Sequence, residues 1–161
     1  MNENYHTLIL NYQELINEIV RIQTSKEPMA LLFNNLNLNQ PFKTRLKVVN
    51  KEYKLLPIVN LTVYRVIQEA CNNIIKHAQA KNVLITITYM KDELEVIIED
   101  DGIGFDSEKS TRPRTDLSGF GVSIMKERVF LLSGNIYFYN KESGGTKIKL
   151  NVPVENNKLE K

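Results

Sequence analysis

Residues 68–77 read Gln68-Glu69-Ala70-Cys71-Asn72-Asn73-Ile74-Ile75-Lys76-His77 and form the second half of a helical pattern that spans residues 58–77. The apolar side chains of this pattern recur at helical spacing as Val63, Val66, Ile67, Ala70, Ile74 and Ile75. Since a helix turns about 100° per residue, Glu69, Asn73 and Lys76 fall on one narrow polar stripe. Their amide oxygen, ammonium and carboxylate could bind Mg²⁺, neutralise phosphate and take a proton. A solvated helix face gives the same spacing, so the pattern alone leaves both interpretations open.

A second cluster of polar residues follows the next two predicted elements, which are strands over residues 82–90 and 93–99. It reads Glu99-Asp100-Asp101-Gly102-Ile103-Gly104-Phe105. Glycines two residues apart let the backbone approach a ligand closely or adopt a positive φ. Asp100, at the strand end, offers an acceptor for an exocyclic amine. Asp-Gly is also the commonest turn signal, so an ordinary turn is the alternative.

The segment over residues 100–121 has no periodicity and is rich in Gly, Ser, Asp, Arg and Pro, which is typical of a lid or a binding loop. Its end, Ser118-Gly119-Phe120-Gly121-Val122, leads into a helix expected over residues 122–132, whose free N–H groups could bind phosphate. Gly134 is expected as the C′ residue of that helix. Two closing strands are expected over residues 135–139 and 145–154, and Gly145-Thr146 opens the second. A lone Gly-x-Gly or a Gly-Gly turn is weak evidence for a site.

The N-terminal part of the chain predicts a helix over residues 5–26, an apolar segment over 29–38 and a strand over 42–49. The whole order predicts an α/β fold, in which a two-layer sandwich places helices on one face of a mixed β-sheet. A helical segment precedes this fold.

Composition narrows the class of protein. The 161 residues fit one domain with a short appendage, and 42% hydrophobic residues indicate a folded core. The net charge of +2 gives no support to direct nucleic-acid binding. One Cys and two His are too few for a Cys/His metal site, and Cys71 is expected to be a buried, inert thiol. No signal peptide or membrane-spanning run is visible, so a reducing, cytoplasmic setting is expected.

The order of these motifs resembles that of bacterial sensor histidine kinases, in the subgroup of nitrate, degradative-enzyme and fatty-acid-desaturase sensors. Residues 68–78 resemble the N box of that family, and Asp100-x-Gly102-x-Gly104 resembles its first glycine box. Gly119-x-Gly121 with the following Met-Lys-Glu-Arg-Val resembles the second glycine box. Gly145-Thr146 resembles the terminal Gly-Thr. Val122 departs from the family, which usually has Leu there, but the position stays apolar.

The resemblance implies the histidine-kinase ATPase fold with ATP and Mg²⁺ as cofactors, and it assigns a role to each site residue. Glu69 would be the base or orienting group for the attacking histidine, and Asp100 would bind the adenine amine. Asn73 would hold Mg²⁺. The remaining residues of the nucleotide site would be Lys76, His77, Gly102, Gly104, Gly119, Gly121 and Thr146.

The resemblance also implies partners and a division of the chain. Residues 1–40 would be the end of the dimerisation and phosphotransfer helix with its linker, 41–154 the ATP-binding catalytic domain, and 155–161 a frayed tail. His6 is followed by Thr7 and matches no acceptor motif, so the phosphoacceptor histidine would lie outside this chain. The full-length protein would be a homodimeric phosphoprotein, cytoplasmic or the cytoplasmic part of a membrane-bound sensor. Its partner would be a response regulator of the LuxR-type DNA-binding class.

Two other functions remain open from the sequence. One is a related ATPase or serine kinase of the same fold, such as an anti-sigma-factor kinase. The other is a nucleotide-binding or dimerising module without turnover. The intact Glu69, Asn73 and Asp100 favour the histidine kinase.

Overall fold

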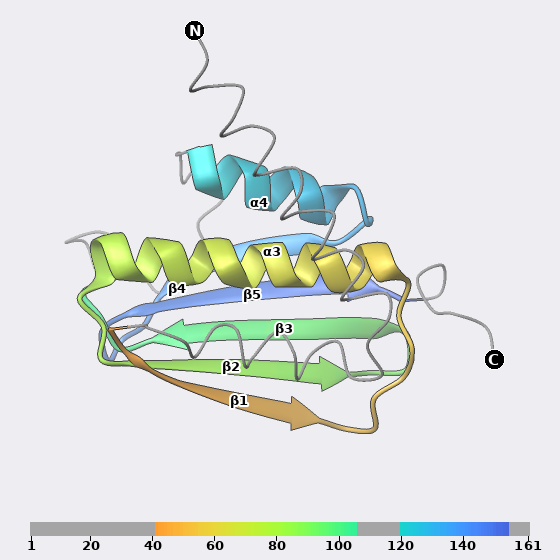
Figure 1. Ribbon diagram of the computed structural model, residues 1–161, viewed down its shortest axis with the longest axis horizontal. Coiled ribbons are helices and arrows are strands. Elements are labelled where there is room, and N and C mark those ends of the chain that lie inside the picture. The colour runs from red at the N-terminus through yellow and green to blue at the C-terminus, as the bar shows by residue number, and fades with distance from the viewer. Residues whose placement is uncertain (1–40, 106–119, 155–161) are drawn as a thin grey trace, which may run out of the picture.

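The computed structural model describes residues 41–105 and 120–154, and these form a two-layer α/β sandwich (Figure 1). The five strands are β1 (Lys43–Val49), β2 (Asn82–Tyr89), β3 (Glu93–Asp100), β4 (Asn135–Asn140) and β5 (Thr146–Pro153). The helices are α3 (Pro57–Asn73), which continues as the π-helical turn η1 (Ile74–Ala78), and α4 (Phe120–Phe130). The predicted fold class is confirmed. The helix and apolar segment predicted within residues 1–40, most of the lid and the tail lie outside the described residues.

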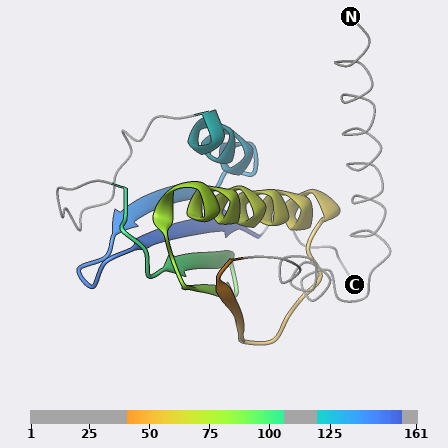
Figure 2. The same cartoon turned by 60° about the vertical axis from the view of Figure 1, so that its left-hand side comes forward.

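The sheet is mixed, as predicted, with the strand order β1-β2-β3-β5-β4. Strand β1 runs parallel to β2, and the other three neighbouring pairs are antiparallel. A parallel pair needs a crossover, which α3 supplies between β1 and β2. Figure 2 shows α3 and α4 on the same side of the sheet, so neither of the described helices covers the opposite face. Among the described residues, no helix is both long and apolar enough to cross a membrane.

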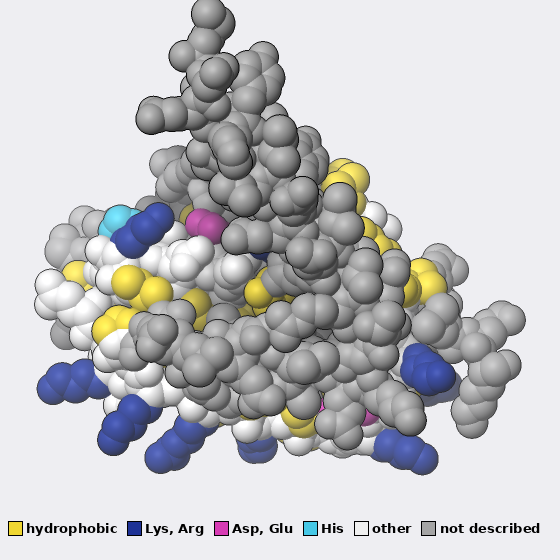
Figure 3. Space-filling model, in the orientation of Figure 1, with side chains coloured by type: hydrophobic (Ala, Val, Ile, Leu, Met, Phe, Trp, Pro, Cys, Tyr) yellow, Lys and Arg dark blue, Asp and Glu magenta, His cyan; other side chains and the backbone are white. Residues whose placement is uncertain are grey.

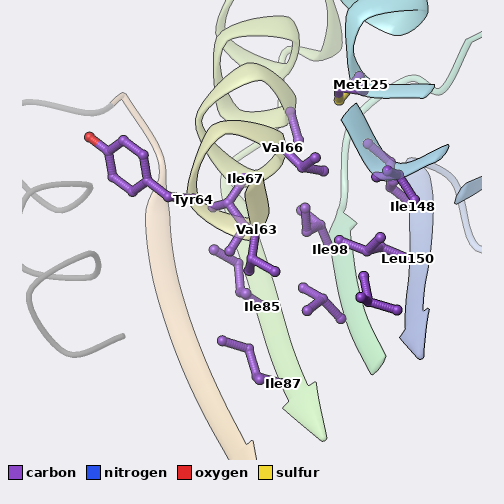
Figure 4. Close-up of a cluster of buried hydrophobic side chains, with 14 of the residues drawn as sticks. Val63, Tyr64, Val66, Ile67, Ile85, Ile87, Ile98, Met125, Ile148 and Leu150 are labelled. Atoms are coloured by element: carbon purple, nitrogen blue, oxygen red, sulfur yellow. The ribbon is translucent and has the colours of Figure 1, made fainter. Parts of the chain in front are cut away.

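The core lies between α3, α4 and the sheet because the strands alternate buried and partly exposed side chains. Figure 4 shows side chains of α3 gathered with those of β2, β3 and β5. Residues that expose 2% or less of their surface include Val63, Val66, Ile67, Ile85, Ile87, Ile98, Met125 and Leu150. Cys71 is also buried, and burial raises the pKa of its thiol to about 12. The expectation of a buried thiol is therefore confirmed.

Strand β1 forms one edge of the described sheet and carries exposed, charged side chains. Lys43, Arg45 and Lys47 alternate along the strand and are all exposed. Figure 3 shows Lys and Arg side chains in a row along the lower edge of the molecule. Charged residues on an edge strand discourage pairing with another chain.

Helix α4 begins two residues earlier and ends two residues earlier than the sequence pattern predicts. The expected C′ glycine is one residue out of place, because Ser133 takes the left-handed φ of 56°. The N–H groups of Ser133 and Gly134 donate to the carbonyls of Phe130 and Val129, as in a Schellman motif. Gly134 has a different role, since a Cβ there would lie 2.5 Å from the carbonyl oxygen of Asn151. The glycine therefore permits close packing of the turn on β5.

Candidate functional site

The polar stripe of α3 lies beside the start of α4. Glu69 and Asn73 are half-buried and are one helical turn apart. A Cβ added at Gly121 would collide with the Glu69 carboxylate, so the first turn of α4 packs directly on this side chain. The structure thus brings together Glu69 of the first motif and Gly121 of the second glycine motif. The other glycine of the second motif, Gly119, lies outside the described residues.

The last turn of the long helix is wider than an α-helix. Residues Ile74–Ala78 form a π-helical turn, and Gln79 then leaves it with a left-handed φ of 53°. Such turns occur often at functional sites. Lys76 and His77 are on this turn and are exposed. The Lys76 ammonium and the His77 imidazole therefore stand at the helix C-terminus, where positive charge is favoured.

Asp100 is the most deeply buried acidic residue of the proposed site, with 3% of its surface exposed. Its Oδ1 accepts a hydrogen bond of 2.8 Å from the N–H of Gly102. Burial raises the pKa of this carboxyl. The bonds from Gly102 and Thr146 and the charge of Lys141 act in the opposite direction. The result is a carboxylate held by protein donors at the end of β3.

Asp101 has a different role, although it is the next residue. It is exposed, and its carboxylate accepts bonds of 2.7 and 2.8 Å from the backbone N–H groups of Lys81 and Asn82. It also accepts one of 2.7 Å from the Asn82 side chain. These bonds lower its pKa to about 2. Successive strand residues point to opposite faces, so Asp101 fastens the start of β2 while Asp100 faces the helices.

The two glycines of the first glycine motif are required for different reasons. A Cβ at Gly102 would collide with the carbonyl of Ala78, and the neighbouring N–H of Ile103 donates to that same oxygen at 2.9 Å. Gly104 has a φ of 83°, which L side chains rarely adopt. The loop after β3 is therefore fastened to the end of the π-helical turn.

Thr146 begins β5 directly beside this loop. It is 7% exposed, and both its N–H and its hydroxyl donate to the Asp100 carboxylate. Asp100 at the end of β3 and Thr146 at the start of β5, both predicted from the sequence as site residues, are therefore in direct contact.

The donor atoms fit a metal that arrives with a phosphate ligand. Among the residues that the structure describes, no group of three or more His, Cys, Asp or Glu could hold a metal ion. Mg²⁺ usually keeps several waters and binds through one or two protein oxygens plus substrate phosphates. The half-buried amide of Asn73 can supply such an oxygen. The residues present therefore suit Mg²⁺ carried by a nucleotide rather than one caged by protein.

Two residues of this region escaped the sequence analysis. Asn140 at the end of β4 accepts a bond of 2.9 Å from the N–H of Phe105, and Lys141 donates one of 3.0 Å to the carbonyl oxygen of Asp100. Asn140 is buried, with 7% of its surface exposed. The one signal in the sequence was a polar residue at a position where the strand alternation predicts an inward side chain.

Comparisons with known proteins identify the family of this chain. Residues 59–156 match the family model described as histidine kinase-, DNA gyrase B- and HSP90-like ATPase. The chain is 36% identical over 114 residues to the sensor histidine kinase ComP of Bacillus subtilis. It is 33% identical over 108 residues to the histidine-protein kinase/phosphatase DegS of Brevibacillus brevis. These matches cover 71% and 67% of this chain but only 14% and 27% of those proteins.

Solved structures show the same fold. The ATP-binding domain of PrrB from Mycobacterium tuberculosis aligns with a TM-score of 0.58 at 19% identity, over 76% of this chain and 87% of that one. The histidine kinase domain of a blue-light activated kinase from Erythrobacter litoralis aligns with a TM-score of 0.59 at 16% identity, over 79% and 58%. The chain therefore belongs to the family of histidine kinase-, DNA gyrase B- and HSP90-like ATPases, and is homologous to the catalytic ATP-binding domains of sensor histidine kinases.

Proposed function

We propose that this chain binds Mg²⁺-ATP and transfers the γ-phosphoryl group to a histidine outside the chain, as the catalytic half of a protein-histidine kinase. The observation that carries the proposal is the buried Asp100 carboxylate, held by Gly102 and Thr146 at the end of β3. A carboxylate kept in place by three protein donors is suited to one further donor, the exocyclic amine of adenine. The homology to sensor histidine kinases supports the same assignment.

The phosphates are assigned to the polar side of α3 and η1. Asn73 would hold Mg²⁺, and Lys76 and His77, on the exposed π-helical turn, would line the phosphates. Gly119 and Gly121 would serve as hinges of a lid over them. Phosphoryl transfer depends mainly on positioning and on stabilising charge, so a cationic turn near the triphosphate suits the reaction.

Glu69 is proposed as the catalytic carboxylate. In the reaction, a nitrogen of the accepting imidazole forms a bond to the γ-phosphorus while the bond to the β-phosphate oxygen breaks and ADP leaves. Glu69 would take the imidazole proton or orient the ring. Its contact with Gly121 at the start of α4 supports this role, because it places the carboxylate beside the second glycine motif.

The homology also supports a proposal for the larger assembly. We propose residues 1–40 as the end of the dimerisation and phosphotransfer helix with its linker, 41–154 as the ATP-binding catalytic domain and 155–161 as a tail. The full-length protein would be a homodimer that is phosphorylated on its own histidine in the cytoplasm. It would pass the phosphoryl group to a response regulator of the LuxR-type DNA-binding class, with no direct contact between this chain and nucleic acid.

Titration calorimetry of the full chain tests the nucleotide assignment. We expect ATP to bind in the presence of Mg²⁺ and to bind more weakly when the metal is removed by a chelator. UTP is the control, because its base has no exocyclic amine to donate to Asp100. Equal binding of ATP and UTP would show that Asp100 does not read the base.

A further inference from the structure

Two residues at the turn between β4 and β5 form hydrogen bonds to the loop that follows β3. Asn140 accepts a hydrogen bond of 2.9 Å from the N–H of Phe105, 35 residues away in the sequence. The Lys141 ammonium donates one of 3.0 Å to the carbonyl oxygen of Asp100, 41 residues away. The segment 100–105 is therefore hydrogen-bonded at one end to Lys141 and at the other end to the neighbouring Asn140.

The loop after β3 is also in close steric contact with β4 and with the turn that follows it. A Cβ at Gly104 would lie 2.9 Å from Oδ1 of Asn140, and a Cβ at Gly145 would collide with the Asp100 carbonyl. The ring of Phe105 also packs edge-on against Phe138 of β4, with 6.0 Å between the ring centres. The loop thus has little room to shift against β4 and β5.

The turn that carries these residues is itself fixed. The N–H of Lys141 donates to the carbonyl of Gly145 at 2.9 Å, and the N–H of Gly144 donates to the carbonyl of Lys141 at 3.0 Å. Thr146, which follows the turn, donates to the Asp100 carboxylate. Asp100 is therefore held through its carbonyl by Lys141 and through its carboxylate by Thr146.

The positive charge of Lys141 has a second, smaller effect on Asp100. Burial raises the pKa of the Asp100 carboxyl, and the Lys141 ammonium acts in the opposite direction, after the hydrogen bonds from Gly102 and Thr146. An ionised carboxylate is an acceptor only, whereas a protonated one also presents a donor. Adenine has a donor amine at the position where guanine has a carbonyl oxygen. The oxygens of an Asp100 carboxylate fixed by these bonds should therefore accept from the adenine amine and repel the carbonyl oxygen of guanine.

We propose that Asn140 and Lys141 are positioning residues that set the preference for adenine over guanine, by fixing the loop 100–105 and the Asp100 carboxylate within it. This inference rests on the proposed function, since it takes Asp100 as the residue that reads the base. Neither residue needs to touch the nucleotide.

The test compares the affinities of the full chain for ATP and GTP in the presence of Mg²⁺. Replacing Lys141→Met keeps the length of the side chain but removes the charge and the donor. We expect the affinity for ATP to fall about two- to tenfold, the range for one lost hydrogen bond, while the affinity for GTP stays nearly constant. Lys141→Arg should restore most of the preference, because it keeps a cationic donor.

Lys147→Met is the matched control. Lys147 belongs to the same hairpin, but it alternates with the buried Thr146 and Ile148 and so points to the face of the sheet opposite α3 and α4. This variant should keep both affinities. Asn140→Ala should lower the ratio of ATP affinity to GTP affinity, as Lys141→Met does. If Asn140→Ala does not fold, the two Lys141 variants alone test the positioning role.

The possible outcomes separate this inference from the proposed function. If Lys141→Met keeps the wild-type ratio, whether both affinities are unchanged or both fall together, the positioning role is wrong. If the wild-type chain binds neither nucleotide, the proposed function itself is wrong.

Discussion

Replacing Asp100→Asn removes one negative charge and changes an acceptor into a donor at the proposed adenine site. The Oδ1 of the new amide can still accept from the Gly102 N–H, which lies 2.8 Å away in the wild type. Its NH₂ group then replaces the second carboxylate oxygen. Because Thr146 and the adenine amine are also donors, this NH₂ group would face donors instead of accepting from them.

The size of the effect follows from the charge and burial of Asp100. A hydrogen bond to a charged group contributes about 1.5–3 kcal/mol, and each 1.4 kcal/mol changes Kd about tenfold. The Kd for Mg²⁺-ATP should therefore rise about 10- to 140-fold. We expect the upper part of this range, because only 3% of Asp100 is exposed and water cannot replace the lost acceptor.

Titration calorimetry at a temperature where both proteins are folded measures this change. Asp101→Asn is the matched control, since it makes the same chemical change one residue later, at a carboxylate that binds Lys81 and Asn82. The control should keep the wild-type Kd. Equal ATP affinity in wild type and Asp100→Asn would falsify the assignment of Asp100 to the adenine.

Three further predictions concern separate parts of the site. Glu69→Gln should keep the affinity for Mg²⁺-ATP and slow phosphoryl transfer, whereas Asn73→Ala should weaken the binding that depends on Mg²⁺; loss of ATP binding in Glu69→Gln would make that carboxylate structural. Gly145→Ala should lower the thermal midpoint more than Gly144→Ala, because both take a positive φ, at about 1–2 kcal/mol each, but only a Cβ at Gly145 also collides with the Asp100 carbonyl. The pKa of Asp101 is lowered from 3.8 to about 2 in the folded chain, so its contribution to stability is present above about pH 4 and is lost as the pH falls toward 2. In Asp101→Asn the thermal midpoint should fall less steeply over that range than in wild type, and identical slopes would contradict this account.

The sequence predicted the layers of the fold because its periodicity follows burial. In β2, Val83, Ile85 and Ile87 are buried, and they alternate with side chains that are more exposed. Such alternation reflects a sheet whose described helices, α3 and α4, pack on one face. The helix over residues 58–77 was equally clear, since one apolar stripe packs on that sheet. These features depend on which residues are apolar and become buried, and the spacing of apolar residues can be read directly from a single sequence.

Other features depend on contacts that the sequence does not record. Asn140 and Lys141 look like ordinary residues at a strand end, and their roles arise only when the fold brings them to a loop 35 to 41 residues away. Asp100 and Asp101 look alike in the sequence, yet one is buried and the other fastens β2. The widened helical turn at Ile74–Ala78 likewise has no signal in the apolar pattern. In each case, packing between distant segments decides the local structure.

The central claim is that this chain donates a phosphoryl group to a histidine that it does not carry. Incubation with γ-labelled ATP and Mg²⁺ tests it most directly, with and without a dimeric fragment that carries the phosphotransfer helices and their accepting histidine. We predict acid-labile label on the fragment only when both are mixed, and no label on this chain in either case. Stoichiometric label on His6 or His77 of this chain would contradict the claim, and so would a fragment that stays unlabelled beside a chain that binds ATP.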